Sequence, residues 1–120
     1  MSEHYRYYDV NGKEIFPGEC ASYNDQEIKA DKGKPKLHLV PWEIVKAIAK
    51  VREYGVKKYG AKESWREVEA ERYIDALLRH TVAFAEHPTG FDDESGFPHL
   101  YHVACNVAFL CEYLKDGRLL

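Results

Sequence analysis

A dense group of acidic residues and histidines occupies residues 91–102, with the sequence FDDESGFPHLYH. Three adjacent acids (92–94) precede His99 and His102, and adjacent carboxylates repel one another unless a cation offsets their charge. Acids ahead of a helix also favour its positive end, and residues 95–98 resemble a helix entry. The segment therefore indicates either a metal site or a capped helix start.

The two histidines of this segment are one helical turn apart, and Asn106 continues the same side of the expected helix. Two such imidazoles can bind one metal ion, or they can be partly buried with satisfied hydrogen bonds. Cys105 lies on the same helix, but zinc sites use denser Cys and His sets, so we interpret it as a core residue.

A second stripe of polar residues is expected on the preceding helix. At about 100° per residue, four side chains fall within about 40° of one line: Glu71, Asp75, Arg79 and Glu86. A solvated face with an ordinary i,i+4 ion pair is one explanation. In the functional interpretation, Glu71 or Asp75 donates oxygens to a cation and Arg79 binds a phosphate.

Charge is distributed unevenly along the chain, although the net charge is only -3. Residues 29–58 carry nine Lys/Arg and three acids, net +6, whereas residues 63–94 carry nine acids and three arginines, net -6. The first segment suits phosphates and the second suits divalent cations. Alternatively, the two segments lie against one another.

Length and composition indicate one soluble domain. The chain has 120 residues, no apolar run near the ~20 residues of a membrane span, and no signal-peptide pattern. Three cysteines without a CxxC pair favour reduced thiols, so we expect a cytoplasmic protein without a membrane partner. Phosphate-binding loops, dinucleotide fingerprints, GxSxG elbows and the HD dyad are missing from the sequence.

The elements that must position these residues are mostly helical. Apolar residues recur at spacings of three and four, which predicts an all-α bundle of three main helices at 41–59, 64–87 and 98–115. A capping-box pattern, Ser64 with Glu67, begins the second helix. Three helices give a thin core, so we expect a homodimer or homotetramer that shares helices across its interface.

The N-terminal part is expected to differ from the bundle. Asn11-Gly12 predicts a small β-hairpin at residues 5–16 with a two-residue type I′ turn. We expect one domain over residues 1–120, in which 1–28 form the hairpin and a connector and 29–115 form the helical core.

The ordered set of motifs in the core resembles a known family. It comprises DKGKPKL (31–37), KYG (58–60), Trp65, ALLRH (76–80), DDESGFPHLYH (92–102) and Asn106. The set resembles a small family, found largely in phages, of dATP/dGTP diphosphohydrolases, which are similar in character to the all-α MazG-like nucleotide pyrophosphohydrolases. The resemblance covers about residues 29–114.

The resemblance implies cleavage between the α- and β-phosphates of a nucleoside triphosphate, dependent on Mg²⁺ or Mn²⁺, to monophosphate and pyrophosphate. The chain departs from MazG-type enzymes, because Glu67, Glu69 and Glu71 have the wrong spacing for their E-E-x-x-E helix. The positions that match the smaller family are Arg79, His80, Asp92, Glu94, Ser95, Gly96, His99 and Asn106.

Together, the charge pattern and the resemblance favour the metal interpretation and assign roles. Glu94 or Glu71 is the expected base, and Asp75, Asp92, His99 and His102 are the expected metal ligands. The expected substrate-binding residues are Lys34, Lys58, Trp65, Arg79, His80 and Asn106.

The expected partner is a nucleotide, with no stable binding of nucleic acid. Two other classes remain open. A nucleotide-binding sponge would hold its ligand without turnover and release it intact on denaturation. A structural or regulatory helical module would not respond to Mg²⁺ or Mn²⁺.

Overall fold

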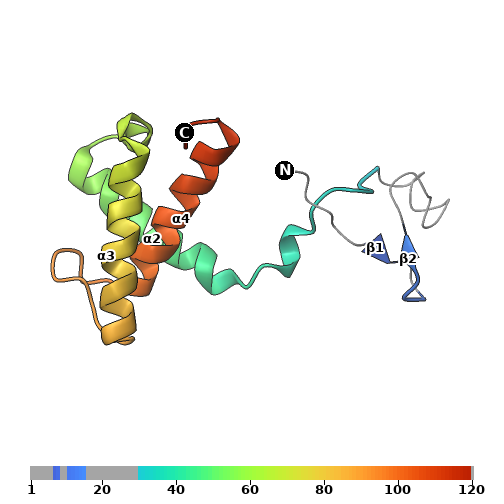
Figure 1. Cartoon of the computed structure of the whole chain (residues 1–120), viewed down its shortest axis with the longest axis horizontal. Coiled ribbons are helices and arrows are strands. Elements are labelled where there is room, and N and C mark those ends of the chain that lie inside the picture. Colours follow the sequence, from blue (N-terminus) through green and yellow to red (C-terminus); the bar gives the residue numbers. More distant parts are fainter. Residues whose placement is uncertain (1–6, 9–10, 16–29, 120) are drawn as a thin grey trace. The chain divides into compact units, whose positions relative to one another are not determined.

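A computed structural model describes residues 7–8, 11–15 and 30–119 of the chain (Figure 1). The chain divides into two compact units, residues 1–40 and residues 41–120. This division falls at the start of the helical part rather than at the expected boundary of residue 28. The expectation of one domain over residues 1–120 stays a prediction.

In the N-terminal unit, two short strands pair in antiparallel fashion. Strand β1 (Tyr7–Tyr8) and strand β2 (Glu14–Ile15) pair with Tyr8 opposite Glu14. A two-residue turn at Asn11-Gly12 would pair Tyr8 with Ile15. The observed register differs from this by one residue, so the prediction of a type I′ turn is wrong. The rest of the expected hairpin lies outside the described residues. A 3₁₀ turn, η1 (Leu37–Leu39), ends this unit.

The second unit is helical, which confirms the all-α prediction for this part of the chain. Helix α2 (Trp42–Tyr59) begins after Pro41 and ends at Gly60, whose φ is +80° and whose N–H donates to the carbonyl of Val56. Glycine adopts this left-handed conformation without the strain that a Cβ brings, which fixes the helix end. Helix α4 (His99–Lys115) follows the predicted bounds within one residue.

The second predicted helix begins later than expected. Ser64–Glu67 form a 3₁₀ turn, η2, and helix α3 (Ala70–Glu86) begins only after Val68 and Glu69 take extended conformations. The capping box is therefore wrong, and the Ser64 hydroxyl donates to the carbonyl of Ala61 instead. The cause is tertiary: the hydroxyl of Tyr113, on α4, lies within hydrogen-bonding distance of the Trp65 and Val68 carbonyls.

Helix α4 organises the unit, because it packs against both α3 and α2 (Figure 1). The buried side chains come from α2 and α4: Ala47, Val51, Cys105, Asn106 and Tyr113. Cys105 is a core residue as predicted. Stacked rings of Trp65 and Phe109 attach η2 to α4, with centroids 4.7 Å apart. The α2–α4 and α3–α4 contacts thus hold the three helices so that side chains of each line one cavity.

The segment between α3 and α4 forms a closed loop that carries the acids. Phe91 and Pro98 form an antiparallel bridge, and the N–H of Asp92 donates to the carbonyl of Phe97 over 2.8 Å. Gly96 has a φ of +76°, which closes the turn. Among the described residues, no helix is both long and apolar enough to cross a membrane.

Candidate active site

A cavity of about 810 Å³ lies among α2, α3, α4, η2 and the loop before α4. This volume is within the range of small-molecule sites. Nine of the residues singled out from the sequence line it: Lys58, Trp65, Asp75, Arg79, His80, Asp92, Glu94, His102 and Asn106. The cavity therefore brings together residues that are up to 48 positions apart in the chain.

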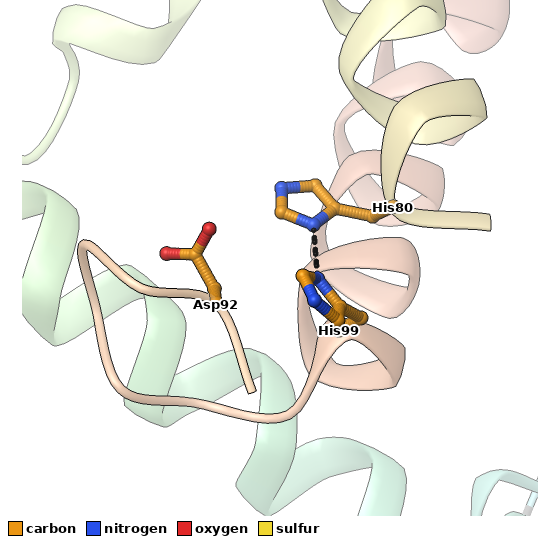
Figure 2. Close-up of side chains that lie close together, drawn as sticks. All are labelled: His80, Asp92 and His99. Atoms are coloured by element: carbon orange, nitrogen blue, oxygen red, sulfur yellow. Dashed lines mark hydrogen bonds between the residues drawn. The ribbon is translucent and has the colours of Figure 1, made fainter. Parts of the chain in front are cut away.

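One end of the cavity carries two side chains suited to a metal ion, His80 and Asp92, and His99 lies against His80 without lining the cavity. The Nδ1 atoms of His80 and His99 lie 3.0 Å apart, and a ligand atom of each lies within 4.8 Å of a carboxylate oxygen of Asp92. Figure 2 shows the two rings in contact, with the Asp92 carboxylate on the loop beside them. Among the described residues, these three form the group with metal-ligand geometry.

His102 lies beside this group rather than in it. Its Nε2 is 2.6 Å from the hydroxyl of Ser95 and 3.7 Å from Asp92 Oδ2, and its ring stacks on His80 with centroids 4.5 Å apart. A Ser-His-Asp triad needs the hydroxyl and the carboxylate on different ring nitrogens. Here one nitrogen faces both, so Ser95 is not arranged as a nucleophile.

Asp92 is held by its own loop. Its Oδ2 accepts a hydrogen bond from the N–H of Ser95 over 2.8 Å. Helix α4 has Pro98 as its N-cap and no side-chain capping hydrogen bond. The acids therefore do not cap this helix, and the alternative interpretation of a capped helix start is wrong. Burial acts to raise the pKa of Asp92, but the Ser95 hydrogen bonds and the two nearby imidazoles outweigh it, and the pKa lies below its usual value.

Burial lowers the pKa of His80 and of His102, and neighbouring imidazoles add to this effect. Both rings are therefore neutral near pH 7. Neutral imidazole is the form that binds metal ions.

Glu94 and Lys58 form an ion pair across the mouth of the cavity. The hydrogen bond from Lys58, followed by one from Tyr54, lowers the pKa of Glu94. The same contact raises the pKa of Lys58. A carboxylate with a lowered pKa is a weak base, so Glu94 would accept a proton more readily after Lys58 has moved to another anion.

Two arginines of α3, Arg72 and Arg79, line the cavity and lie two helical turns apart. Arg72 and Arg79 form neither an ion pair nor a side-chain hydrogen bond with any described residue, and both are exposed. The i,i+4 ion pair between Asp75 and Arg79, which the alternative of a solvated face would allow, is thus not formed within the described part of the chain. Guanidinium groups without protein partners suit phosphate oxygens.

The other end of the cavity is aromatic. Tyr73, Phe109 and Trp65 line it, and the hydroxyl of Tyr73 donates to the carbonyl of Trp65 over 2.7 Å. The Trp65 ring is stacked on Phe109 and carries the guanidinium of Arg66 at 4.4 Å. Trp65 is expected from the sequence to bind substrate, and these contacts also give it a packing role.

The remaining expected residues have other surroundings. Asn106 is buried and its Nδ2 donates to the carbonyl of His102 over 2.8 Å, which fixes its amide at the cavity wall. Glu71 is exposed and is not among the residues that line the cavity. Lys34 belongs to the N-terminal unit.

Sequence reasoning did not single out several residues that line the cavity, among them Arg52, Arg72, Tyr54, Tyr73 and Phe109. Arg72 precedes Arg79 by two helical turns, so the helical period alone would have identified it. The aromatic residues carry no such signal, since their spacing is that of ordinary core packing.

Comparisons with known proteins agree with these observations. The family model for the N-terminal part of dATP/dGTP diphosphohydrolases matches residues 24–120. A dATP/dGTP diphosphohydrolase of Salmonella phage PMBT28 is 35% identical over 89 residues, which cover 74% of this chain. The matched region spans only 30% of that relative's length. No solved structure matches the chain.

Proposed function

Because the chain belongs to the dATP/dGTP diphosphohydrolase family, we propose that it hydrolyses a purine deoxynucleoside triphosphate, dATP or dGTP. The products would be the monophosphate and pyrophosphate. We further propose that its helical unit has MazG-like character. The observation that carries the proposal is one cavity with metal-ligand side chains at one end, arginines along its wall and aromatic rings at the other end.

The charges of the cavity suit a triphosphate. A nucleoside triphosphate carries about four negative charges, which need cationic partners during transfer of a phosphoryl group. Lys58, Arg72 and Arg79 are three of the four cationic side chains that line the cavity, and the fourth is Arg52. The purine and deoxyribose would lie toward Tyr73 and Phe109, because flat aromatic surfaces suit a base.

The acidic loop supports the divalent ion of the proposal, Mg²⁺ or Mn²⁺. Asp92 and His99, with His80, have the donor atoms for it, and the Ser95 N–H holds the Asp92 carboxylate. When bound, the ion would supply Lewis acidity toward the phosphate oxygens. Asp75 lines the same cavity and remains a candidate outer contact.

Glu94 is the proposed base, and Lys58 controls it. A phosphate that binds Lys58 would draw the ammonium away from Glu94, which raises the pKa of the carboxyl toward its usual value. Glu94 could then take a proton from the attacking water. Substrate binding would in this way free Glu94 from its ion pair with Lys58, so that Glu94 can act as the base.

We also propose that the chain acts as a homodimer or homotetramer. Helix α3 has seventeen residues and none is fully buried, although its apolar residues recur at helical spacing. Ile74, Leu78 and Val82 form an exposed stripe along it, and Leu78 and Val82 are each 56% exposed. Burial of such a stripe by a second copy would complete a core that one chain leaves thin.

The direct test is incubation with a panel of ribo- and deoxynucleoside triphosphates and Mg²⁺ or Mn²⁺, followed by chromatography of the products. The proposal predicts purine monophosphate and pyrophosphate in equal amounts. Tight binding with release of intact nucleotide on denaturation would indicate a sponge instead. Absence of both turnover and binding would indicate a structural module.

A further inference from the structure

We propose that His80, Asp92 and His99 form a site for a divalent transition-metal ion, which binds there more tightly than Mg²⁺ does. The inference deepens the proposed function, since the ion would serve the same cavity. Its test measures binding without nucleotide, so it does not require that hydrolysis occurs.

The first argument is the spacing of the two imidazoles. With metal–nitrogen bonds of about 2.1 Å, neighbouring ligand atoms lie about 3.0 Å apart around an octahedral ion and about 3.4 Å around a tetrahedral one. The observed separation of the His80 and His99 Nδ1 atoms is 3.0 Å. One ion can therefore be bound by both rings without a change in the α3–α4 packing.

The second argument is the position of Asp92. The ligand atoms of the three residues lie within 4.8 Å of one another, whereas opposite ligands of one ion are about 4.2 Å apart. A shift of the Asp92 side chain by roughly 1–2 Å would bring its oxygen to the spacing of an opposite or a neighbouring ligand. The loop already directs the carboxylate to this place, because the Ser95 N–H donates a hydrogen bond to its Oδ2.

The third argument is the chemistry of the donor atoms. Mg²⁺ prefers oxygen ligands and keeps much of its water, whereas imidazole nitrogen favours ions from Mn²⁺ to Zn²⁺ in the first transition series. Two imidazoles and one carboxylate leave positions open for water or phosphate oxygens. The site therefore selects by donor type, and Asp75 and His102 are not needed as direct ligands.

A hydrogen bond between two neutral imidazoles gives the same separation without any ion, and it is the competing account. It predicts that neither histidine affects metal binding. The two accounts are therefore distinguished by titration of metal-free protein with CoCl₂ and with MgCl₂, followed by calorimetry and by the visible absorption of Co²⁺.

We expect one Co²⁺ per chain, bound at least about 100-fold more tightly than Mg²⁺, with an absorption spectrum of nitrogen-ligated cobalt. His80→Ala and His99→Ala should each weaken Co²⁺ binding by at least about tenfold, and circular dichroism checks that both variants are helical. His87→Ala is the matched control, since His87 is an exposed histidine at the end of α3 and should leave binding unchanged.

Wild-type affinity for Co²⁺ in both His80→Ala and His99→Ala would overturn the inference, as would equal affinity of the wild type for Mg²⁺ and Co²⁺. Hydrolysis supported by Mg²⁺ in a protein without a Co²⁺ site would overturn the inference and leave the proposed function intact. Co²⁺ binding without any hydrolysis would support the inference and contradict the proposed function.

Discussion

His80 on α3 and His99 at the first turn of α4 meet through their Nδ1 atoms, 3.0 Å apart. The contact joins the two helices that pack most extensively on one another. Because packed helices resist small displacements, the separation of the two rings is set by the fold rather than by either side chain alone. Changes to the loop before α4 should therefore affect the site through Asp92, while the histidine pair persists.

Gly96→Ala should lower both stability and metal affinity. Gly96 has a φ of +76°, so an added Cβ costs about 1 kcal/mol of folding free energy and strains the loop that holds Asp92. Urea unfolding and Co²⁺ titration measure the two effects. Gly117→Ala is the control, because Gly117 has a φ of +72° at the far end of α4. It should lose similar stability and keep its metal affinity; equal losses of affinity in both variants would contradict the role of the loop.

Lys58→Ala should shift the pH dependence of hydrolysis and weaken substrate binding. The Lys58 hydrogen bond holds the pKa of Glu94 below its usual value, so its removal raises that pKa and moves the acidic limb of the rate profile to higher pH. Loss of a phosphate contact should raise KM roughly tenfold.

Steady-state kinetics from pH 4 to 8 measure both effects of Lys58→Ala. Lys57→Ala removes a neighbouring exposed lysine that does not line the cavity, and it should change neither. An unshifted acidic limb in Lys58→Ala would remove Glu94 from the role of base.

Metal-free protein should be less stable at pH 5.5 than at pH 7.5. The pKa values of His80 and His102 are lowered in the folded state, chiefly by burial. Below about pH 6.5 the unfolded chain therefore binds protons that the folded chain does not, and the free energy of unfolding falls as pH falls through this range. Urea unfolding in the presence of EDTA measures this change. His102→Gln should show a smaller loss; a loss as large as that of the wild type would contradict the contribution of His102.

Parts of the fold could be predicted from the sequence because their determinants are local. The apolar spacing predicts α2, and Gly60 predicts where it ends. Pro98 and Gly117 predict the start and the end of α4. The start of α3 could not be predicted, because the Tyr113 hydroxyl binds the Val68 carbonyl 45 residues away and keeps that residue extended.

In the site, too, some residues could be predicted from the sequence and others depend on tertiary contacts. Asp92 and His99 stood out as chemical residues, whereas the spacing of His99 and His102 allowed a shared ion and His102 lies beside the group rather than in it. Only the packing of α3 on α4 brings His80 to His99, and only the loop turns Ser95 toward His102. Contacts of this kind depend on three-dimensional packing and leave no regular spacing in the sequence.

Tyr113→Phe should reduce the free energy of unfolding by about 1–3 kcal/mol, because the part-buried Val68 carbonyl loses a hydrogen-bond donor, whereas the Trp65 carbonyl still accepts from the Tyr73 hydroxyl. Chemical denaturation measures the change. Tyr101→Phe is the control, since the Tyr101 hydroxyl has no hydrogen bond within the described residues, and it should change stability by less than about 0.5 kcal/mol. Equal stability of both variants would contradict the anchoring of η2 by Tyr113.

Leu78→Glu should convert the proposed oligomer to a monomer. A carboxylate in the middle of the exposed stripe of α3 would be buried without a partner when two copies associate. Light scattering at micromolar concentration gives the mass. Leu39→Glu, at an exposed leucine of the N-terminal unit, is the control and should keep the oligomer. A wild-type mass near the 13.9 kDa of one chain would contradict the proposal.

Hydrolysis of dGTP and dATP by wild type, Asp92→Asn and Asp93→Asn, with Mn²⁺ and product chromatography, tests the proposed site most directly. Asp93 is adjacent to Asp92 but exposed, and it does not line the cavity. We expect wild type and Asp93→Asn to form monophosphate and pyrophosphate at similar rates, and Asp92→Asn to be slower by about 100-fold or more. Turnover by Asp92→Asn at the wild-type rate, or intact nucleotide after incubation with the wild type, would contradict this account.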